Sequence, residues 1–173
     1  MLAYVFSHRP ADGADIAAYE ASLRGFHELL AKAKPEGFIS SSTFRVSGRY
    51  DDWYLLEGSA AMDVINHIAM KDEQGRAHDE VARMAADGYG KLYKLASGDP
   101  PAGNGYEVRF SKPHGIKYPD FYARLDPWTR EPTVSLWRRQ MVLGPAPEFC
   151  LISDKDFELP ADMTPEALKR EPI

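Results

Sequence analysis

The sequence predicts an α+β fold in which two βαββαβ halves, the second of them truncated, bring their antiparallel sheets together around one core. Three observations predict it. Strand-like and helix-like patterns alternate in a fixed order, a Gly- and Pro-rich segment interrupts them at residues 98–105, and the order restarts after that segment. We therefore expect a first half at residues 1–97, a linker at 98–105 and a shorter second half at 106–173.

The first half begins with a strand and a helix. Residues 2–7 are aromatic and β-branched and precede Pro10, which favours a short strand. Beyond the capping residues at 12–15, apolar side chains recur at spacings of three and four, which predicts one helical stripe. The stripe consists of Ile16, Tyr19, Leu23, Phe26 and Leu30. Pro35 and Gly37 are expected to end this helix.

Four further elements complete the first half, in the order strand, strand, interrupted helix, strand. Their expected ranges are 38–46, 53–57, 59–87 with a charged interruption at 71–76, and 92–95. The resulting order β-α-β-β-α-β is that of a ferredoxin-like unit.

The second half repeats this order but stops early. Its expected elements are a strand at 106–110, a helix at 118–125 ended by Asp126-Pro127, strands at 134–143 and 149–152, and a last helical turn after Pro165. The second copy is therefore expected to be truncated after its third strand.

Four blocks of the two halves align in the same order. They share element type and apolar phase, and they pair 6–7 with 110–111, 19–23 with 121–125, 42–45 with 135–138, and 52–56 with 148–152. We interpret them as a diverged duplication; a chance alignment of amphipathic segments is the alternative.

One ferredoxin-like unit places both helices on one face of its sheet, so the other face needs a cover, which a second sheet can supply. The pattern resembles the dimeric α/β-barrel superfamily. The segment 137–145 is most similar to a bacterial branch with two tandem ferredoxin-like halves and no assigned reaction. That superfamily also includes cofactor-free and haem-degrading monooxygenases, chlorite dismutase-like haem proteins, dye-decolourising peroxidases and stress-responsive barrels. The resemblance implies a fold and leaves the function open.

Composition excludes several classes of function. The net charge of −5, from 21 basic and 26 acidic side chains, includes no long basic run, which argues against nucleic-acid binding. Cys150 lies in an apolar run and is expected to be a small buried hydrophobe and not a reactive thiol. No apolar run approaches the ~18 residues of a membrane span, and the first residues lack the charged start of a signal peptide. We therefore expect a cytoplasmic protein that binds no membrane.

The five histidines offer candidate chemistry. His8 directly follows the first strand and could carry protons near neutral pH; a solvated loop histidine is the alternative. His67 is the better candidate for a haem ligand, with a helix-surface histidine as the alternative, and His27 is expected at a helix surface or boundary. No HExxH or CxxC motif occurs, so no metal site is predicted.

Cofactor-free monooxygenases of the superfamily typically use Asn, Trp and Tyr or His. The resemblance implies Asn66, Trp53 and His67 as the nearest such set, although no motif matches residue by residue. The catalytic candidates are therefore His8, His67 and Trp53; for Trp53, a place in the core is the alternative.

Two arginines interrupt an apolar strand. Because strand residues alternate between faces, Trp137 and Arg139 share one face and Arg138 points to the other, so one arginine must be directed at the barrel interior. A buried arginine needs an anionic partner, which could be a bound carboxylate or one of the glutamates Glu57, Glu107 and Glu148. Arg45 is the matching residue of the first half. The ligand-binding candidates are Arg45, Arg138, Arg139, Trp137 and Asn66.

Three functions remain open on the sequence. The first is the binding of a small apolar or carboxylate-bearing molecule between the sheets. The second is an oxygen-using enzyme, either a cofactor-free monooxygenase or a haem-dependent oxidoreductase. The third is a non-catalytic assembly or interaction module. No cofactor is predicted apart from haem in the second case, and the chain is expected to be a monomer or a homodimer.

Overall fold

Eight strands form the frame of the molecule in a computed structural model that describes residues 1–100, 103 and 105–173. They are β1 (Leu2–Pro10), β2 (Phe38–Val46), β3 (Arg49–Leu56), β4 (Ala85–Ser97), β5 (Gly105–Phe110), β6 (Ser135–Arg139), β7 (Phe149–Ser153) and β8 (Glu166–Pro172). They close into one antiparallel barrel in the order β1-β3-β2-β8-β5-β7-β6-β4. The predicted α+β class and its antiparallel barrel arrangement are confirmed.

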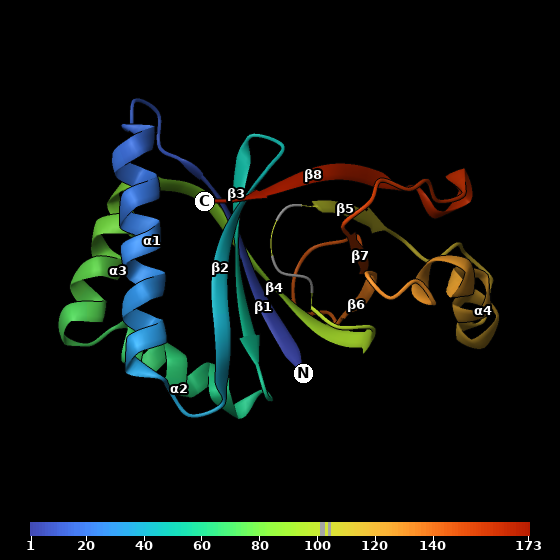
Figure 1. Cartoon of the computed structure of the whole chain (residues 1–173), viewed down its shortest axis with the longest axis horizontal. Helices are drawn as coiled ribbons and strands as arrows, with labels where there is room; N and C mark the ends of the chain where they lie inside the picture. Colours follow the sequence, from blue (N-terminus) through green and yellow to red (C-terminus); the bar gives the residue numbers. More distant parts are fainter. Residues whose placement is uncertain (101–102, 104) are drawn as a thin grey trace.

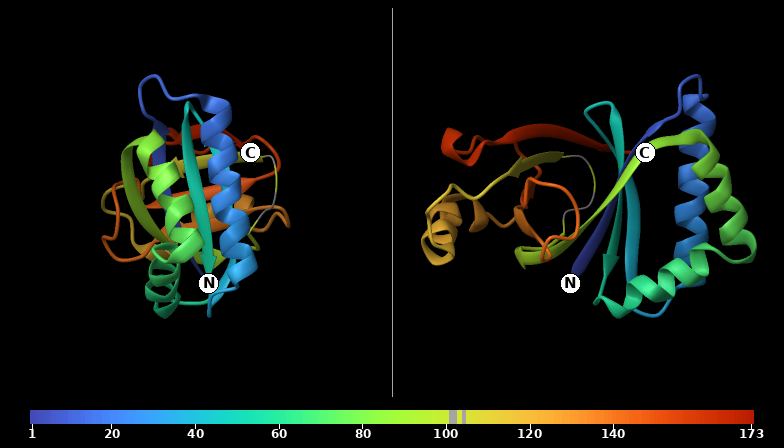
Figure 2. Two further views of the ribbon diagram at one scale, coloured as in Figure 1. Left: turned by 90° about the vertical axis from the view of Figure 1, so that its left-hand side faces the viewer. Right: turned by 180° about the vertical axis from the view of Figure 1, so that it is seen from behind.

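The helices cover two opposite sides of this barrel. They are α1 (Ile16–Ala33), α2 (Ala60–Ala69), α3 (Asp72–Met84) and α4 (Tyr118–Thr129). The first three lie together over the sheet of the first half, and α4 lies on the far side (Figures 1 and 2). No helix of the described residues is both long and apolar enough to cross a bilayer.

Helix α1 forms where the apolar stripe predicts it. The Asp15 side chain caps it by accepting a hydrogen bond of 3.1 Å from the Ala18 amide, and Lys34 ends it in a left-handed conformation. Leu23 and Leu30, both 0% exposed, lie on the face that packs against the sheet. This face holds α1 over the strands of its own half.

Helix α4 passes through Pro127 to Thr129, so the expected stop at Asp126-Pro127 is wrong. A proline inside a helix costs one backbone hydrogen bond. Here Phe121 and Leu125, both fully buried, anchor the helix on its sheet before the proline is reached.

The chain ends in a strand, and the expected last helical turn after Pro165 is wrong. A 3-10 turn at Ala161–Met163 precedes β8, which pairs with β2 on one side and β5 on the other. Ladder hydrogen bonds to two strands outweigh a local helix-start signal. The second half therefore keeps its fourth strand and lacks a second helix. Of the expected linker, Pro101, Ala102 and Asn104 lie outside the described residues.

A pseudo-twofold relates the two halves. Exchanging β1–β4 with β5–β8 leaves the order of strands in the barrel unchanged, and the observed registers then determine which residues are equivalent. Under the pseudo-twofold, His8 is equivalent to Phe110, Arg45 to Arg138, Tyr50 to Phe149, and Lys94 to Glu171. The aligned block at 42–45 is confirmed. The blocks at 6–7 and 52–56 are displaced along their strands.

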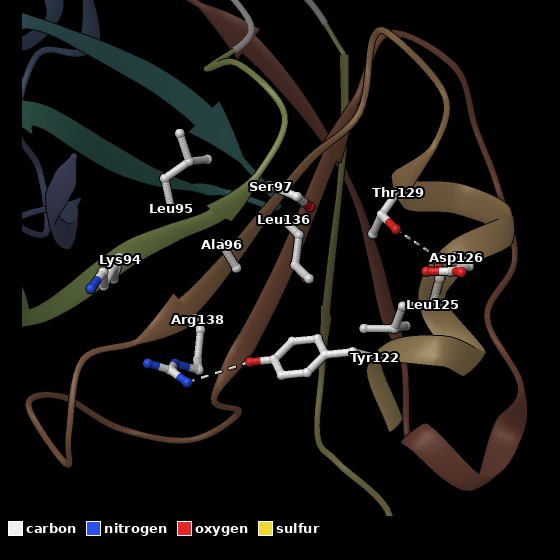
Figure 3. A pocket seen from close by; sticks show the side chains of 10 residues that line it. All are labelled: Lys94, Leu95, Ala96, Ser97, Tyr122, Leu125, Asp126, Thr129, Leu136 and Arg138. Atoms are coloured by element: carbon white, nitrogen blue, oxygen red, sulfur yellow. Dashed lines mark hydrogen bonds between the residues drawn. The ribbon is translucent and has the colours of Figure 1, made fainter. Parts of the chain in front are cut away.

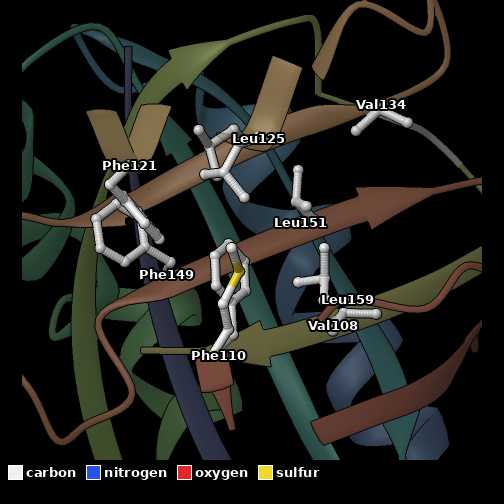
Figure 4. Close-up of a cluster of buried hydrophobic side chains, with 10 residues drawn as sticks. Val108, Phe110, Phe121, Leu125, Val134, Phe149, Leu151 and Leu159 are labelled. Atoms are coloured by element: carbon white, nitrogen blue, oxygen red, sulfur yellow. The ribbon is translucent and has the colours of Figure 1, made fainter. Parts of the chain in front are cut away.

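Side chains fill the barrel interior. Trp53 and Trp137 contact each other there with ring centroids 5.3 Å apart, and both are buried. A second apolar cluster lies outside the barrel, between α4 and its sheet, and contains Phe110, Phe121, Leu125, Phe149 and Leu151 (Figure 4). Two cavities lie outside the barrel, between the sheets and the helices.

Candidate functional site

A cavity of about 730 Å³ lies between the outer face of the first-half sheet and α1–α3. Aromatic side chains form much of its wall: Tyr4, Phe6, Phe26 and Tyr54. Residues from α2 and α3, among them Asn66 and His78, close the opposite side. A mostly apolar cavity with a few converging polar groups is the usual form of a small-molecule site.

Strand β4 makes room for two of these rings because it carries no side chains beneath them. A Cβ atom at Gly88 would lie 2.5 Å from the ring of Phe6, and one at Gly90 would lie 2.5 Å from the hydroxyl of Tyr4. Both distances are far below van der Waals contact, so these two glycines determine where the rings stand.

Four polar side chains meet at one wall of the cavity, and we call them the Asp52 cluster: Asp52, His8, His27 and Thr43. Asp52 lines the cavity although it is only 3% exposed. Thr43 Oγ1 donates a hydrogen bond of 2.6 Å to Asp52 Oδ1, and His8 Nε2 lies 3.1 Å from Oδ2. His27 Nε2 lies 3.4 Å from Oδ1. One carboxylate is thus held by two imidazoles and a hydroxyl.

The second ring nitrogen of each of the two histidines also has a hydroxyl partner. The Tyr19 hydroxyl contacts His8 Nδ1, and Ser41 Oγ lies 2.6 Å from His27 Nδ1. His27 also packs against the ring of Tyr54, with centroids 5.3 Å apart. Partners on the second ring nitrogen fix the orientation of an imidazole and give a proton a path away from the carboxylate.

Opposing influences act on the Asp52 carboxyl. Burial by itself raises the pKa of Asp52, but the nearby imidazoles of His27 and His8 together outweigh burial and bring the pKa below its ordinary value. Burial and the nearby Asp52 charge raise the pKa values of Tyr54 and Tyr4. At neutral pH the wall therefore presents one carboxylate beside two neutral hydroxyl donors.

The second half shows that the fold does not need this cluster. By the barrel registers, His8, Thr43 and Asp52 correspond to Phe110, Leu136 and Leu151. Those three belong to the apolar cluster beneath α4 (Figure 4). Buried ionic groups often contribute less stability than apolar replacements of similar size. The Asp52 cluster thus marks a place where the first half departs from what packing alone favours, which is typical of a functional site.

The three candidate catalytic residues lie in different places, and the ligand-binding candidate Asn66 lies at the cavity. His8 belongs to the Asp52 cluster and is fully buried, so it is not a solvated loop histidine. Asn66 lines the cavity. His67 is exposed on α2 and does not line it. Trp53 points into the barrel, on the face opposite Asp52, and stacks on Tyr93 with centroids 5.9 Å apart.

The candidate ligand-binding side chains do not converge on one site. Arg45 is paired with Glu20, and Arg138 lines a second cavity near α4. Trp137 is fully buried in the barrel and donates from Nε1 to Ser135 Oγ over 2.9 Å.

Arg139 is the arginine on the inward-facing phase of β6, and of its two expected partners, a glutamate or a bound carboxylate, the glutamate is wrong. Its Nη1 donates to the Gly144 carbonyl over 2.9 Å, and its Nε is buried without a partner among the described residues. Of the three glutamates expected as partners, Glu107 is buried and is paired with Arg109 instead. A carbonyl of the loop after β6 takes the place that a glutamate was expected to fill.

Sequence analysis missed Asp52 and placed His27 at a helix surface or boundary. His27 is 8% exposed and reaches the sheet, so the helix-surface alternative is wrong. The missed signal was a pair of acids inside a strand, directly before Trp53 and Tyr54. Acidic residues are rare in buried strands, and such a pair needs partners.

The cavity does not fit haem. His78 is the one described histidine that lines it, and its Nδ1 is buried without a hydrogen-bond partner. However, three carboxylates line the cavity, those of Asp52, Asp63 and Asp87, and the described lining contains neither lysine nor arginine. The two propionates of a haem would face like charges. No cluster of three or more metal-ligating side chains occurs among the described residues.

Comparison with known proteins identifies the fold. No family model matches the chain, and no curated protein matches it. A candidate monooxygenase from Lactobacillus acidophilus NCFM matches with a TM-score of 0.63 at 8% identity, over 99% of this chain and 93% of that chain. A candidate chlorite dismutase matches with a TM-score of 0.61 at 11% identity, over 99% and 94%. An anthrone oxidase-like protein matches with a TM-score of 0.60 at 10% identity, over 99% and 91%. The chain therefore has the dimeric α/β-barrel fold, as its sequence pattern implied.

Proposed function

We propose that the protein binds a flat, weakly acidic aromatic molecule in the cavity beneath α1–α3 and oxidises it with dioxygen, without a bound cofactor. One observation carries the proposal: the aromatic wall contains a buried carboxylate, Asp52, backed by two histidines that can share its proton. The likeness to the structures described above as a monooxygenase and an anthrone oxidase-like protein makes oxygen chemistry the first reaction to test.

The cavity favours a phenol or an anthrone over a carboxylic acid. Aromatic rings pack favourably against a planar ligand. Tyr4 and Tyr54 stay protonated and can donate hydrogen bonds to a ligand oxygen. The carboxylates of the lining would repel an anionic head group, and of these only Asp87 is paired with a described arginine, Arg9. This argues against a carboxylate-bearing ligand here, and it moves the proposed site from between the sheets to the outside of the barrel.

The reaction needs a proton acceptor and an oxidant. Asp52 accepts a proton from an activated C–H or O–H bond of the ligand and passes it to His8 or His27, because its lowered pKa does not let the carboxyl keep the proton. Tyr4 and Tyr54 stabilise the oxygen of the resulting anion. The electron-rich anion reduces dioxygen, which adds to the carbon, and loss of water leaves a ketone. A CH₂ group and O₂ thus become C=O and H₂O, so no external reductant is required.

Replacing the carboxylate tests this proposal. Asp52→Asn keeps the size of the side chain but removes the proton acceptor, so we expect the rate of oxygen consumption with anthrone to fall by about 10²–10⁴-fold. An oxygen electrode and the absorbance of the anthraquinone product measure the rate, and an anaerobic sample should yield no product.

Asp63→Asn is the matched control, because Asp63 lines the same cavity but is exposed. It should keep its rate within a few-fold of the wild type. The proposal fails if the wild type turns over neither anthrone nor a hydroquinone above the uncatalysed rate. It also fails if Asp52→Asn and Asp63→Asn behave alike.

A further inference from the structure

Arg138 lacks the acidic partner that its symmetry mate possesses. The mate is Arg45, which occupies the equivalent position in the first half. Arg45 binds Glu20 of α1 in a two-pronged fashion, with Nε to Oε1 at 2.6 Å and Nη2 to Oε2 at 2.7 Å. Tyr50 also donates to that carboxylate, over 2.7 Å. In the first half, the arginine at this position therefore binds a carboxylate from the helix that covers the sheet.

In the second half each of these partners is replaced. Helix α4 takes the place of α1, with Phe121 and Leu125 as fully buried as Tyr19 and Leu23. Tyr122 then stands where Glu20 stands, and Arg138 Nη1 reaches its hydroxyl only over 3.4 Å. No other hydrogen bond joins the Arg138 guanidinium to a described residue.

The strand opposite Arg138 adds a second positive charge. Lys94 is its direct partner across β4 and β6, whereas Glu171 is the partner of Arg45. Like charges at directly opposite positions on one sheet face are destabilising. Neither Lys94 nor Arg138 forms an ion pair with a described residue.

These groups border a cavity of about 470 Å³ between α4 and the β4–β6 junction, which we call the Arg138 pocket (Figure 3). Leu95, Leu125 and Leu136 give it apolar walls. Its one described carboxylate, that of Asp126, is already paired with Arg130. In Figure 3 the guanidinium of Arg138 reaches across the pocket toward Tyr122.

We propose that the Arg138 pocket binds an organic carboxylate with an apolar body. The carboxylate takes the place that Glu20 occupies beside Arg45, with a two-pronged contact to Arg138 and a second cation in Lys94. The apolar body lies against the leucines. This site is separate from the cavity beneath α1–α3, and the two prefer ligands of different charge.

The test uses 2-naphthoate as the probe and 2-naphthamide as its uncharged analogue, with binding followed by chemical-shift changes of the residues that line the Arg138 pocket, so that binding beneath α1–α3 is not counted. The wild type should bind the carboxylate about tenfold more tightly than the amide, because charge-assisted hydrogen bonds are the stronger ones. Arg138→Met should lose that preference. Arg124→Met is the matched control and should keep it, because Arg124 lies on α4, which borders the pocket, but pairs with Asp162 outside the pocket.

A second variant separates binding from folding. Tyr122→Glu recreates the Arg45–Glu20 arrangement, so it should fold with a melting temperature no lower than that of the wild type. It should also bind 2-naphthoate at least about tenfold more weakly, since its own carboxylate occupies Arg138. The proposal is overturned if the wild type binds both probes equally or neither, or if Tyr122→Glu binds the carboxylate like the wild type. Asp52→Asn should leave 2-naphthoate binding unchanged, which distinguishes this site from the first cavity.

Discussion

Neighbouring residues on β3 serve opposite faces of the sheet. Asp51 points into the barrel, where Ser7 and Arg109 contact it, and its burial raises the pKa of its carboxyl. Asp52 points outward to the cavity, and its pKa is lowered. Of two consecutive aspartates, one therefore belongs to a structural ion pair inside the barrel and the other is the proposed proton acceptor outside it. The acids are visible in the sequence, but their separate roles depend on partners from other elements, which periodicity does not specify.

The internal repeat predicts how the Asp52 cluster can be removed. Asp52→Leu alone should destabilise the protein by about 3–5 kcal/mol, because it leaves buried histidines without their anion. His8, Thr43 and Asp52, three of the four members of the cluster, should be changed together with Tyr19 to their counterparts in the second half, Phe, Leu, Leu and Phe. This variant should restore part of that loss, because only His27 then stays buried without its anion.

Urea unfolding of the single and the fourfold variant measures this difference. The fourfold variant should bind anthrone without turning it over. If it is less stable than Asp52→Leu, the cluster contributes to stability in a way that the second half does not reproduce.

At the level of elements, β4 is the strand that makes the cavity. It runs for 13 residues from the end of α3, and its glycines lie beneath Tyr4 and Phe6. The sequence predicted only residues 92–95 as this strand, because Gly88 and Gly90 are typical of a turn or helix end. Pairing with β1 over most of its length overrides that local preference. By contrast, the boundaries of β2 agree with the prediction, since β-branched and aromatic residues extend to both of its ends.

Filling the space beneath Tyr4 should close part of the cavity. Gly90→Ala places a methyl group against the Tyr4 hydroxyl and displaces the ring, so we expect anthrone to bind about tenfold more weakly. Fluorescence titration measures the affinity. Gly58→Ala is the control, because a Cβ there meets open space. Equal affinities of the two variants would show that Tyr4 does not contact the ligand.

For the molecule as a whole, the barrel interior contains several buried charged side chains. Glu107 and Asp51 both contact Arg109, and the guanidinium of Arg170 lies 3.6 Å from the ring centroid of Phe44. Arg170 comes from β8, the strand that completes closure. Sequence analysis could predict two sheets that share a core. It could not predict how the core is filled, because these pairs join residues far apart in the chain.

Lys91, inside the barrel, makes the free energy of unfolding depend on pH. Burial, together with the charge of Arg109, lowers the pKa of Lys91 to about 8. An unfolded lysine keeps its proton up to about pH 10.4. Between these values the unfolded state binds a proton that the native state does not, so the Lys91 contribution to the free energy of unfolding rises with pH, by about 3 kcal/mol in total.

The comparison variant is Lys91→Met, which removes the charge and keeps the chain length. It should be more stable than the wild type at pH 7, and this advantage should shrink between pH 8 and pH 10. Cys150, whose pKa is raised by burial, shifts stability in the opposite direction. It is present in both proteins, so its contribution cancels in the difference except for the part that comes from its charge interaction with Lys91. An advantage that stays constant over this range would contradict the low pKa of Lys91. Urea unfolding at several pH values provides the data.

Closure of the barrel by one chain has a consequence for stoichiometry. In a barrel assembled from two identical subunits, every substitution occurs in both subunits, so each pocket is present twice in identical form. Here Asp52 faces no second aspartate and Glu20 no second glutamate, because their counterparts are Leu151 and Tyr122. If both proposed sites are used, one molecule would therefore bind two different ligands, one of each.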